Sequence, residues 1–225
     1  MKRFLAFVAK AILGLIAFSI LWVGAYRLLN PPTTYLMIRD RLNGVEVKQQ
    51  WVGLDEISRH LPRAVIAAED SRFCEHRGFD VQAIEKAMEA NEKGKKLRGG
   101  STISQQTAKN AFLWPGRTMI RKGIEAWFTG LTELIWGKPR IMEVYLNVAE
   151  FGRGVFGVEA ASRHYFHKSA KNLSRQEAAR LAAILPQPIK RDAASPGRYT
   201  KRYANRIAGR TKVVANEGLD SCVWR

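Results

Sequence analysis

Residues 64–80 read AVIAAEDSRFCEHRGFD and carry the strongest structural and chemical signal in the chain. An apolar helical run over residues 64–68 ends in two adjacent acids, Glu69 and Asp70. Because burial disfavours a charged carboxylate, this position is expected to raise the pKa of the acid. A carboxylate tuned in this way can act as a general base near neutral pH. The alternative is that the two acids only mark a helix end, since buried carboxylates also occur in structural networks.

The chain has 225 residues and a formal net charge of +17. This length favours one domain with an appendage, and the apolar content is sufficient for a buried core. Three kinds of partner are compatible with the charge: nucleic acid, an anionic membrane surface, or a polyanionic substrate. Cys74 and Cys222 lie far apart and lack the spacing of a metal site. The sequence leaves open whether they form a disulfide.

An apolar segment from Phe4 to about Leu29 begins close to the N-terminus. It is long enough to cross a bilayer core, which needs roughly 20 mostly apolar residues. Trp22 and Tyr26 near its end are typical of membrane interfaces, and the basic residues before it favour a cytoplasmic N-terminus. The alternative is a cleaved signal peptide, which should have a shorter apolar region of about 7–15 residues. We therefore predict that residues 1–29 form a cytoplasmic N-terminus and a transmembrane helix.

A β-hairpin is expected directly after this anchor. Asn43 and Gly44 form a strong turn signal between two candidate strands, Tyr35–Leu42 and Val45–Val52. Residues 30–53 are therefore interpreted as a linker and a hairpin.

Helical patterns dominate residues 54–225, so the fold class is mainly α with one small hairpin. Asp80 is expected to N-cap a helix over residues 81–93, Ser101 a helix over 102–111, and Thr118 a helix that ends near residue 136. The further helices expected are 139–150, a helix ending at 166, a helix between the capping box at 174–177 and Pro186, and 199–215. The helix after Thr118 has an apolar stripe that should face the core: Ile120, Ile124, Trp127, Leu131, Leu134 and Ile135.

Two polar clusters follow the pair of acids. Gly99 and Gly100 precede a helix start, where backbone N–H groups and the helix dipole favour anions. Ser101, Gln106 and Lys109 add polar and cationic groups there, although an ordinary capped helix is the alternative.

The second cluster contains Arg121, Lys122 and Glu125, with Arg117 nearby in the sequence. Arg121 and Glu125 share one helix face, and the alternative is a surface ion pair of small energetic value. The histidines show no metal-ligand spacing, so no metal site is predicted, and His76 is expected to orient neighbouring groups through hydrogen bonds.

Four motifs occur in a fixed order along the chain. They are Glu-Asp-x-x-Phe-x-x-His-x-Gly-Phe-Asp from residue 69, Gly-Gly-Ser-Thr-Ile-Ser-Gln-Gln-x-x-Lys-Asn from 99, Arg-Lys-x-x-Glu from 121, and Lys-x-x-Ile-x-Glu-x-Tyr-Leu-Asn from 138. With them the chain resembles the family 51 glycosyltransferases, the peptidoglycan transglycosylases, over about residues 57–190. Ser104 stands where the family usually has threonine. The chain ends without a transpeptidase domain, which is typical of the monofunctional biosynthetic form.

The resemblance implies a lysozyme-like fold with a head lobe and a membrane-proximal jaw lobe, within residues 54–225. It also implies that the enzyme polymerises lipid II into β-1,4-linked glycan by an inverting single displacement and releases undecaprenyl diphosphate. Glu69 would be the general base and Glu125 the second essential carboxylate. The implied substrate-binding residues are Gln106, Lys109, Arg117, Arg121, Lys122, Ser101 and Asp70. No cofactor is required, and a divalent cation, Mg or Mn, is optional.

The implied location is the inner (cytoplasmic) membrane, with the catalytic domain in the periplasm. The expected partners are lipid II, the growing glycan chain, membrane lipid, and proteins of cell-wall synthesis or division. Two other readings compete with this one. A lytic, lysozyme-like enzyme would not need the cations between Lys109 and Lys122, and a nucleic-acid binder should interleave aromatic with basic residues. That interleaving is not evident, so no nucleic-acid partner is expected.

Overall fold

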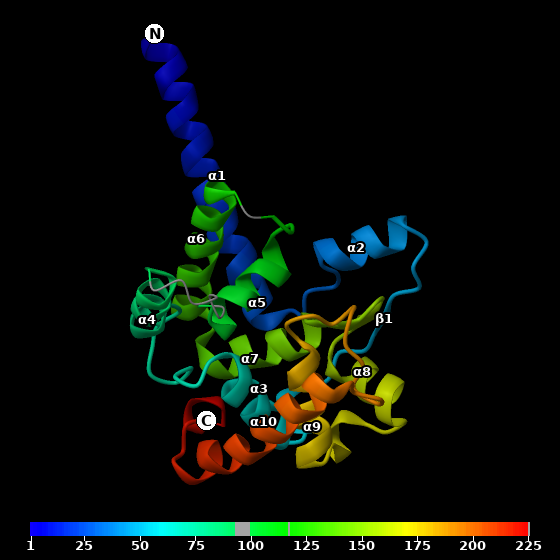
Figure 1. The fold of residues 1–225 in the computed structure, drawn as a ribbon. Coiled ribbons are helices and arrows are strands. Elements are labelled where there is room, and N and C mark those ends of the chain that lie inside the picture. Colours follow the sequence, from blue (N-terminus) through cyan, green and yellow to red (C-terminus); the bar gives the residue numbers. More distant parts are fainter. Residues whose placement is uncertain (93–99, 117, 225) are drawn as a thin grey trace.

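The computed structural model describes residues 1–92, 100–116 and 118–224 of the chain. One long N-terminal helix projects from a helical body, and a small sheet lies at one side of that body (Figure 1). The mainly helical fold expected from the sequence is therefore confirmed.

Ten α-helices, three short 3-10 helices and three strands occur in the described residues. The α-helices are α1 (Lys2–Leu28), α2 (Tyr35–Leu42), α3 (His60–Glu69), α4 (Val81–Glu92), α5 (Ile103–Phe112), α6 (Met119–Ile135), α7 (Gly137–Val148), α8 (Val158–Phe166), α9 (Arg175–Ile184) and α10 (Arg198–Asn216). The 3-10 helices are η1 (Leu54–Glu56), η2 (Ala170–Asn172) and η3 (Ser221–Val223), and the strands are β1 (Lys48–Gln49), β2 (Glu150–Gly152) and β3 (Val155–Phe156).

Helix α1 is the one helix of the described residues that is long and apolar enough to span a membrane, with a mean hydropathy of 2.4 in its most apolar window. Its C-terminal half also packs on the body beside α6 (Figure 1). The indole of Trp136 donates a hydrogen bond to the Val23 carbonyl at 2.7 Å, and that of Trp127 donates to the Ser19 hydroxyl at 3.0 Å. The anchor is therefore joined to the folded domain by specific contacts.

The predicted hairpin at residues 35–52 is wrong. Residues 35–42 form helix α2, because the Thr34 hydroxyl caps the N-terminus and Met37 and Asp40, three residues apart, are both buried. Asn43 and Gly44 do form a turn, but this turn ends a helix instead of joining two strands. Glycine just after a helix is also a common C-terminal signal, so the same pair of residues suits both structures.

The small sheet has the strand order β1-β3-β2. Strands β2 and β3 form an antiparallel pair, and β1 joins β3 in parallel from about a hundred residues earlier in the chain. A Cβ at Gly154 would lie 2.2 Å from the Glu46 carbonyl oxygen, and the φ of Gly154 is +72°, so only glycine fits there. A hairpin thus exists in the fold, but at residues 150–156.

The helices of the body form two groups that meet at the end of α3. Helices α3, α9 and α10 pack on one another, and α5 packs against α6 and α7. This arrangement agrees with the two-lobed fold expected from the resemblance. Asn147 ties α7 to the chain before η1, because its buried side chain accepts a hydrogen bond from the Val52 N–H and donates one to the Val52 carbonyl, both at 2.9 Å.

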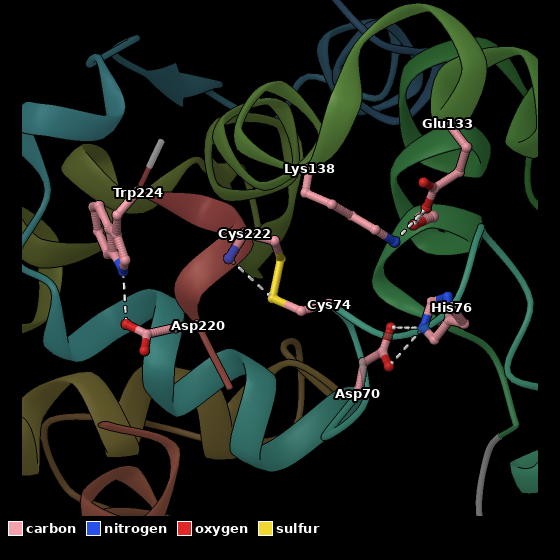
Figure 2. Close-up of a disulfide and its surroundings, with 9 residues drawn as sticks. Asp70, Cys74, His76, Glu133, Lys138, Asp220, Cys222 and Trp224 are labelled. Carbon is pink, nitrogen blue, oxygen red and sulfur yellow. Dashed lines mark hydrogen bonds and ion pairs between the residues drawn. A yellow bond between two sulfur atoms is a disulfide. The ribbon is translucent and has the colours of Figure 1, made fainter. Parts of the chain in front are cut away.

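A disulfide between Cys74 and Cys222 joins the loop after α3 to η3 (Figure 2). Asp220 lies close to it in the chain and accepts hydrogen bonds from Arg63 at 2.8 Å and from the Trp224 indole at 2.6 Å. The C-terminal segment is thereby held against the loop that follows Glu69. This pairing settles a question that the sequence left open.

Candidate active site

Glu69 is the last residue of α3 and follows a buried apolar run. Burial raises the pKa of its carboxyl group, against the hydrogen bond from Gln106 and the nearby charge of Arg191, which lower it. This is the direction expected from the sequence, because the apolar end of α3 removes water from the carboxylate. Glu69 is therefore suited to hold and release a proton closer to neutral pH than an ordinary glutamate.

Gln106 connects Glu69 to α7. Its Nε2 donates to Glu69 Oε2 at 3.0 Å, while its Oε1 accepts a hydrogen bond from the Tyr145 hydroxyl at 3.3 Å. Tyr145 is almost fully buried, and burial raises its pKa well above the usual value, so it stays a proton donor. The tyrosine fixes the orientation of the amide and hence of the carboxylate. Tyr145 lies in the fourth motif, but no role is predicted for it from the sequence.

Asp70 is buried, and its side chain points toward His76 (Figure 2). Its side chain is only 2% exposed and accepts hydrogen bonds from His76 at 2.9 Å and from the Ile103 N–H at 2.9 Å. The predicted anion site at the start of α5 is thus occupied by an acid of the chain itself. Asp70 therefore connects the end of α3 to the start of α5, and His76 orients it as predicted. The substrate-binding role expected for Asp70 stays a prediction.

Ser101 is exposed and lines the cavity beside Glu69, but it does not cap α5 as expected. Thr102 is the N-cap, in a capping box with Gln105, and its hydroxyl donates to the Gly78 carbonyl at 2.6 Å. This bond to Gly78 decides the position of the cap, because it connects the helix start to the loop after α3. The basic residues at 93–99 lie outside the described part of the chain.

Arg121, Lys122 and Glu125 meet on one face of α6. The side chains of Arg121 and Glu125 are only 6% and 4% exposed, and they form an ion pair at 2.8 Å. Lys122 contacts the other oxygen of Glu125 from a more exposed position. The alternative of a surface ion pair is therefore wrong, because the pair is buried. Arg117, the remaining predicted cation, lies outside the described residues.

Lys109 lies between these two parts of the site. Its pKa is lowered by burial and by the charges of Arg121 and Lys122, while Glu125 and Glu69 oppose this effect. Lys109 lies on α5, which carries Gln106 and packs against α6. That Glu69 and Glu125 act in one site stays a prediction.

The apolar stripe predicted for α6 does not face the core throughout. Leu131 is buried, but Ile120 is 78% exposed and Leu134 is 83% exposed. The buried face is partly polar, because Arg121 and Glu125 form an ion pair there. The exposed apolar face lies on the helix that packs beside α1, so it suits contact with lipid.

A cavity of about 420 Å³ opens beside Glu69 between α3, α5 and α10. In residues 1–92, 100–116 and 118–224, no group of three or more His, Cys, Asp or Glu side chains could hold a metal ion. The optional divalent cation remains a prediction. The cavity is lined by Ala68, Glu69, Ser101, Gln106, Pro186, Arg191, Tyr199, Tyr203, Arg206, Ile207 and Arg210.

Comparison with known proteins tests the resemblance. Residues 37–217 match the Transglycosylase family. The chain belongs to this family. It is therefore a glycosyltransferase enzyme, as the four motifs predicted.

Relatives of this transglycosylase cover nearly the whole chain. A protein of Caulobacter vibrioides is 53% identical over 211 residues, which are 94% of this chain and 92% of that protein. A protein of Shewanella oneidensis is 53% identical over 205 residues, 89% of this chain and 88% of that protein. A third, of Pseudomonas entomophila, is 49% identical over 205 residues, 88% of this chain and 87% of that protein. All three are named biosynthetic peptidoglycan transglycosylase.

Proposed function

We propose that this transglycosylase polymerises lipid II into β-1,4-linked glycan strands by a single inverting displacement and releases undecaprenyl diphosphate. Membership of the family and the names of the relatives support the class of reaction. The observation that carries the proposal is the cavity of about 420 Å³ beside Glu69, whose carboxylate is held by a hydrogen bond from Gln106. Helix α6, which packs against α5, carries two cations paired with Glu125. The base and these cations are proposed to act on one bound substrate.

Glu69 is proposed as the general base that takes the proton of the acceptor sugar's 4-hydroxyl. A sugar hydroxyl is a weak nucleophile and needs a base in the transition state. The raised pKa of Glu69 makes it a better proton acceptor than an ordinary glutamate. Gln106 holds the carboxylate in one orientation through its 3.0 Å hydrogen bond.

The cations are proposed to stabilise the departing diphosphate. This group leaves as a stable anion, so it needs preorganised positive charge more than a strong proton donor. Lys109, Arg121 and Lys122 supply that charge, and the buried Glu125 holds the last two in place. Gln106 and Ser101, which line the cavity, are proposed to contact the sugars.

An α-linked donor that yields a β-linked product undergoes one inversion. Inverting glycosidases, in which the two carboxylates act on opposite sides of the sugar, are the closest analogy. Glu69 ends α3 and Glu125 lies on α6, so the two carboxylates come from different helices. Different roles for the two carboxylates are proposed, in a direct displacement without a covalent glycosyl-enzyme. The optional Mg or Mn would act with the diphosphate, and no step assigned to these residues depends on it.

The membrane anchor and the disulfide support a periplasmic catalytic domain. Disulfides persist in oxidising compartments such as the periplasm and are rare in the cytoplasm. The bond between Cys74 and Cys222 lies in the domain, while Lys2 and Arg3 before α1 favour a cytoplasmic N-terminus. We propose a single-pass protein of the inner membrane whose lipid-linked substrate stays in the bilayer. Partners from cell-wall synthesis or division remain a prediction.

A polymerisation assay with purified lipid II tests this function. The full-length chain in detergent should produce long glycan and free undecaprenyl diphosphate. Glu69→Gln should abolish the product while lipid II binding remains, and the exposed Glu217→Gln should behave like the unsubstituted chain as a matched control. Cleavage of preformed glycan without polymerisation would favour the lytic reading, and near-normal turnover of Glu69→Gln would remove Glu69 from the base role.

A further inference from the structure

The cavity beside Glu69 has a cationic wall that the proposed displacement does not use. Three of its lining residues are Arg191, Arg206 and Arg210, and two are Tyr199 and Tyr203. We call these five residues the α10 wall, because four of them lie on α10 and Arg191 precedes that helix. The wall is separate from the cations of α5 and α6.

Two arginines of the α10 wall pack against its two tyrosines. The Arg191 guanidinium lies 5.4 Å from the centroid of the Tyr199 ring, and that of Arg206 lies 5.7 Å from the Tyr203 ring. The two tyrosine rings are 6.3 Å apart. Stacking on a ring uses the face of a guanidinium and leaves its N–H edge available for two parallel hydrogen bonds to a carboxylate.

The positive charge of the wall is not neutralised by the protein. Within the described ranges, none of the three arginines forms an ion pair with an aspartate or glutamate. Arg191 is held by a hydrogen bond to the Ala183 carbonyl at 2.6 Å, while Arg206 and Arg210 are exposed. Glu69 is the one acid among the lining residues. A ligand in this cavity therefore meets excess positive charge.

The wall has a fixed position relative to Glu69. The Tyr203 hydroxyl donates to the Ala68 carbonyl at 3.3 Å, one residue before the proposed base. Helix α10 packs against α3 and α9, and Ala204 and Ile207 on α10 are buried. A sugar positioned at Glu69 would thus have its substituents within the same cavity as the arginines.

We propose that the α10 wall binds the free carboxylate groups on the peptide of the glycan unit that lies at Glu69. This inference rests on the proposed function and adds a specificity determinant to it. The tyrosines offer faces for the apolar surface of sugar rings, and the arginines match the planar geometry of carboxylates. The diphosphate is left to Lys109 and the α6 cations. The enzyme should consequently prefer a peptide with free carboxylates over one whose carboxylates are amidated.

A binding experiment tests the wall without requiring turnover. The probes are a soluble disaccharide-pentapeptide without diphosphate, the same compound with its carboxylates amidated, and a short isoprenyl diphosphate. The full-length chain in detergent is titrated with each. Replacing both Arg206 and Arg210 by alanine should weaken binding of the free-carboxylate probe by about tenfold, the scale of one hydrogen bond between charged groups. The amidated probe and the isoprenyl diphosphate should change little.

Matched variants separate this effect from damage to the fold. Lys212→Ala removes an exposed cation from the same helix outside the cavity and should leave all three affinities unchanged. Lysine at positions 206 and 210 should restore part of the preference, since charge returns without the bidentate geometry.

Several outcomes would overturn the proposal. Equal losses for the free and amidated probes would assign the wall to sugar binding or to stability. A loss confined to the isoprenyl diphosphate would assign it to the leaving group, and unchanged affinities, or no binding of the glycopeptide at all, would remove it from recognition. These affinities are measured without turnover, so they can be interpreted even if the chain does not polymerise lipid II. Failure of the proposed function and failure of this inference are therefore distinguishable.

Discussion

Gln106 Nε2 lies 3.0 Å from Glu69 Oε2, while Tyr145 holds the other end of the same amide. The hydrogen bond stabilises the charged form of Glu69 and lowers its pKa, against the larger effect of burial. Burial and this hydrogen bond thus act in opposite directions on the pKa of the proposed base. The hydrogen bond comes from Gln106 on α5, whose amide is held by Tyr145 on α7.

Replacing Gln106 by leucine should shift the pH dependence of the reaction. Loss of the hydrogen bond raises the pKa of Glu69 further, because it removes a contact that favours the carboxylate. The base is then protonated up to a higher pH, so the acid limb of the kcat/KM profile should move to higher pH. The profile is measured on lipid II, with the exposed Gln82→Leu as a control. An acid limb that stays in place would show that Gln106 does not tune the base.

Asp70 should matter for the fold more than for substrate contact. Asp70→Ala removes a buried carboxylate that accepts hydrogen bonds from the Ile103 N–H and from His76. We expect a loss of about 1–3 kcal/mol in the free energy of unfolding, the cost of leaving buried donors unpaired. Denaturant unfolding measures it, and Asp55→Ala, at an exposed acid, is the control. A variant of normal stability with a raised KM would instead restore the substrate-binding role.

Lys109→Ala should weaken binding of the diphosphate donor. The lysine is half-buried on α5, and burial lowers its pKa, so water only partly screens its charge. KM for lipid II should rise by about tenfold or more, the scale of a lost charged hydrogen bond. Inhibition by phosphoglycolipid antibiotics of the moenomycin type should weaken in parallel. Lys86→Ala, at an exposed site on α4, is the control, and unchanged affinities in Lys109→Ala would exclude Lys109 from the donor site.

The disulfide should stabilise the domain across a long loop. It connects residues separated by 148 positions, and closing such a loop restricts the unfolded chain. Replacing Cys74 and Cys222 by serine should lower the free energy of unfolding by about 2–5 kcal/mol. Thermal unfolding of the oxidised, reduced and substituted forms measures this. Two free thiols in protein recovered from the periplasm would contradict the pairing.

Local signals in the sequence predicted the helices well. The hydroxyl of Thr118, the capping box at Ser174 and the carboxylate of Asp80 all act where expected, because a cap bonds to backbone groups two or three residues away. The order of four motifs also sufficed to predict the family. Such inferences need only near neighbours in the chain.

The errors came where one local pattern suits two structures. Asn43 and Gly44 favour a hairpin and a helix end alike, and the helix prevailed because Thr34 caps it and Met37 is buried by distant residues. On α6, periodicity predicted an apolar stripe that faces the core, but Ile120 and Leu134 of that stripe are exposed. The buried face instead includes the ion pair of Arg121 and Glu125, which periodicity does not predict.

The sequence by itself determined the helical class and an apolar N-terminal segment long enough to span a membrane, since these follow from composition and hydropathy. The order of the motifs determined the family. The catalytic roles of Glu69 and Glu125 stay predictions. Only the tertiary structure decided that Asp70 accepts a hydrogen bond at the start of α5 and that Cys74 forms a disulfide with Cys222. It also decided that the arginines of α10 line the cavity beside Glu69. These relationships join segments far apart in the chain. They arise when helices pack and exclude water, and no local pattern of residues encodes the partner of a side chain at that distance.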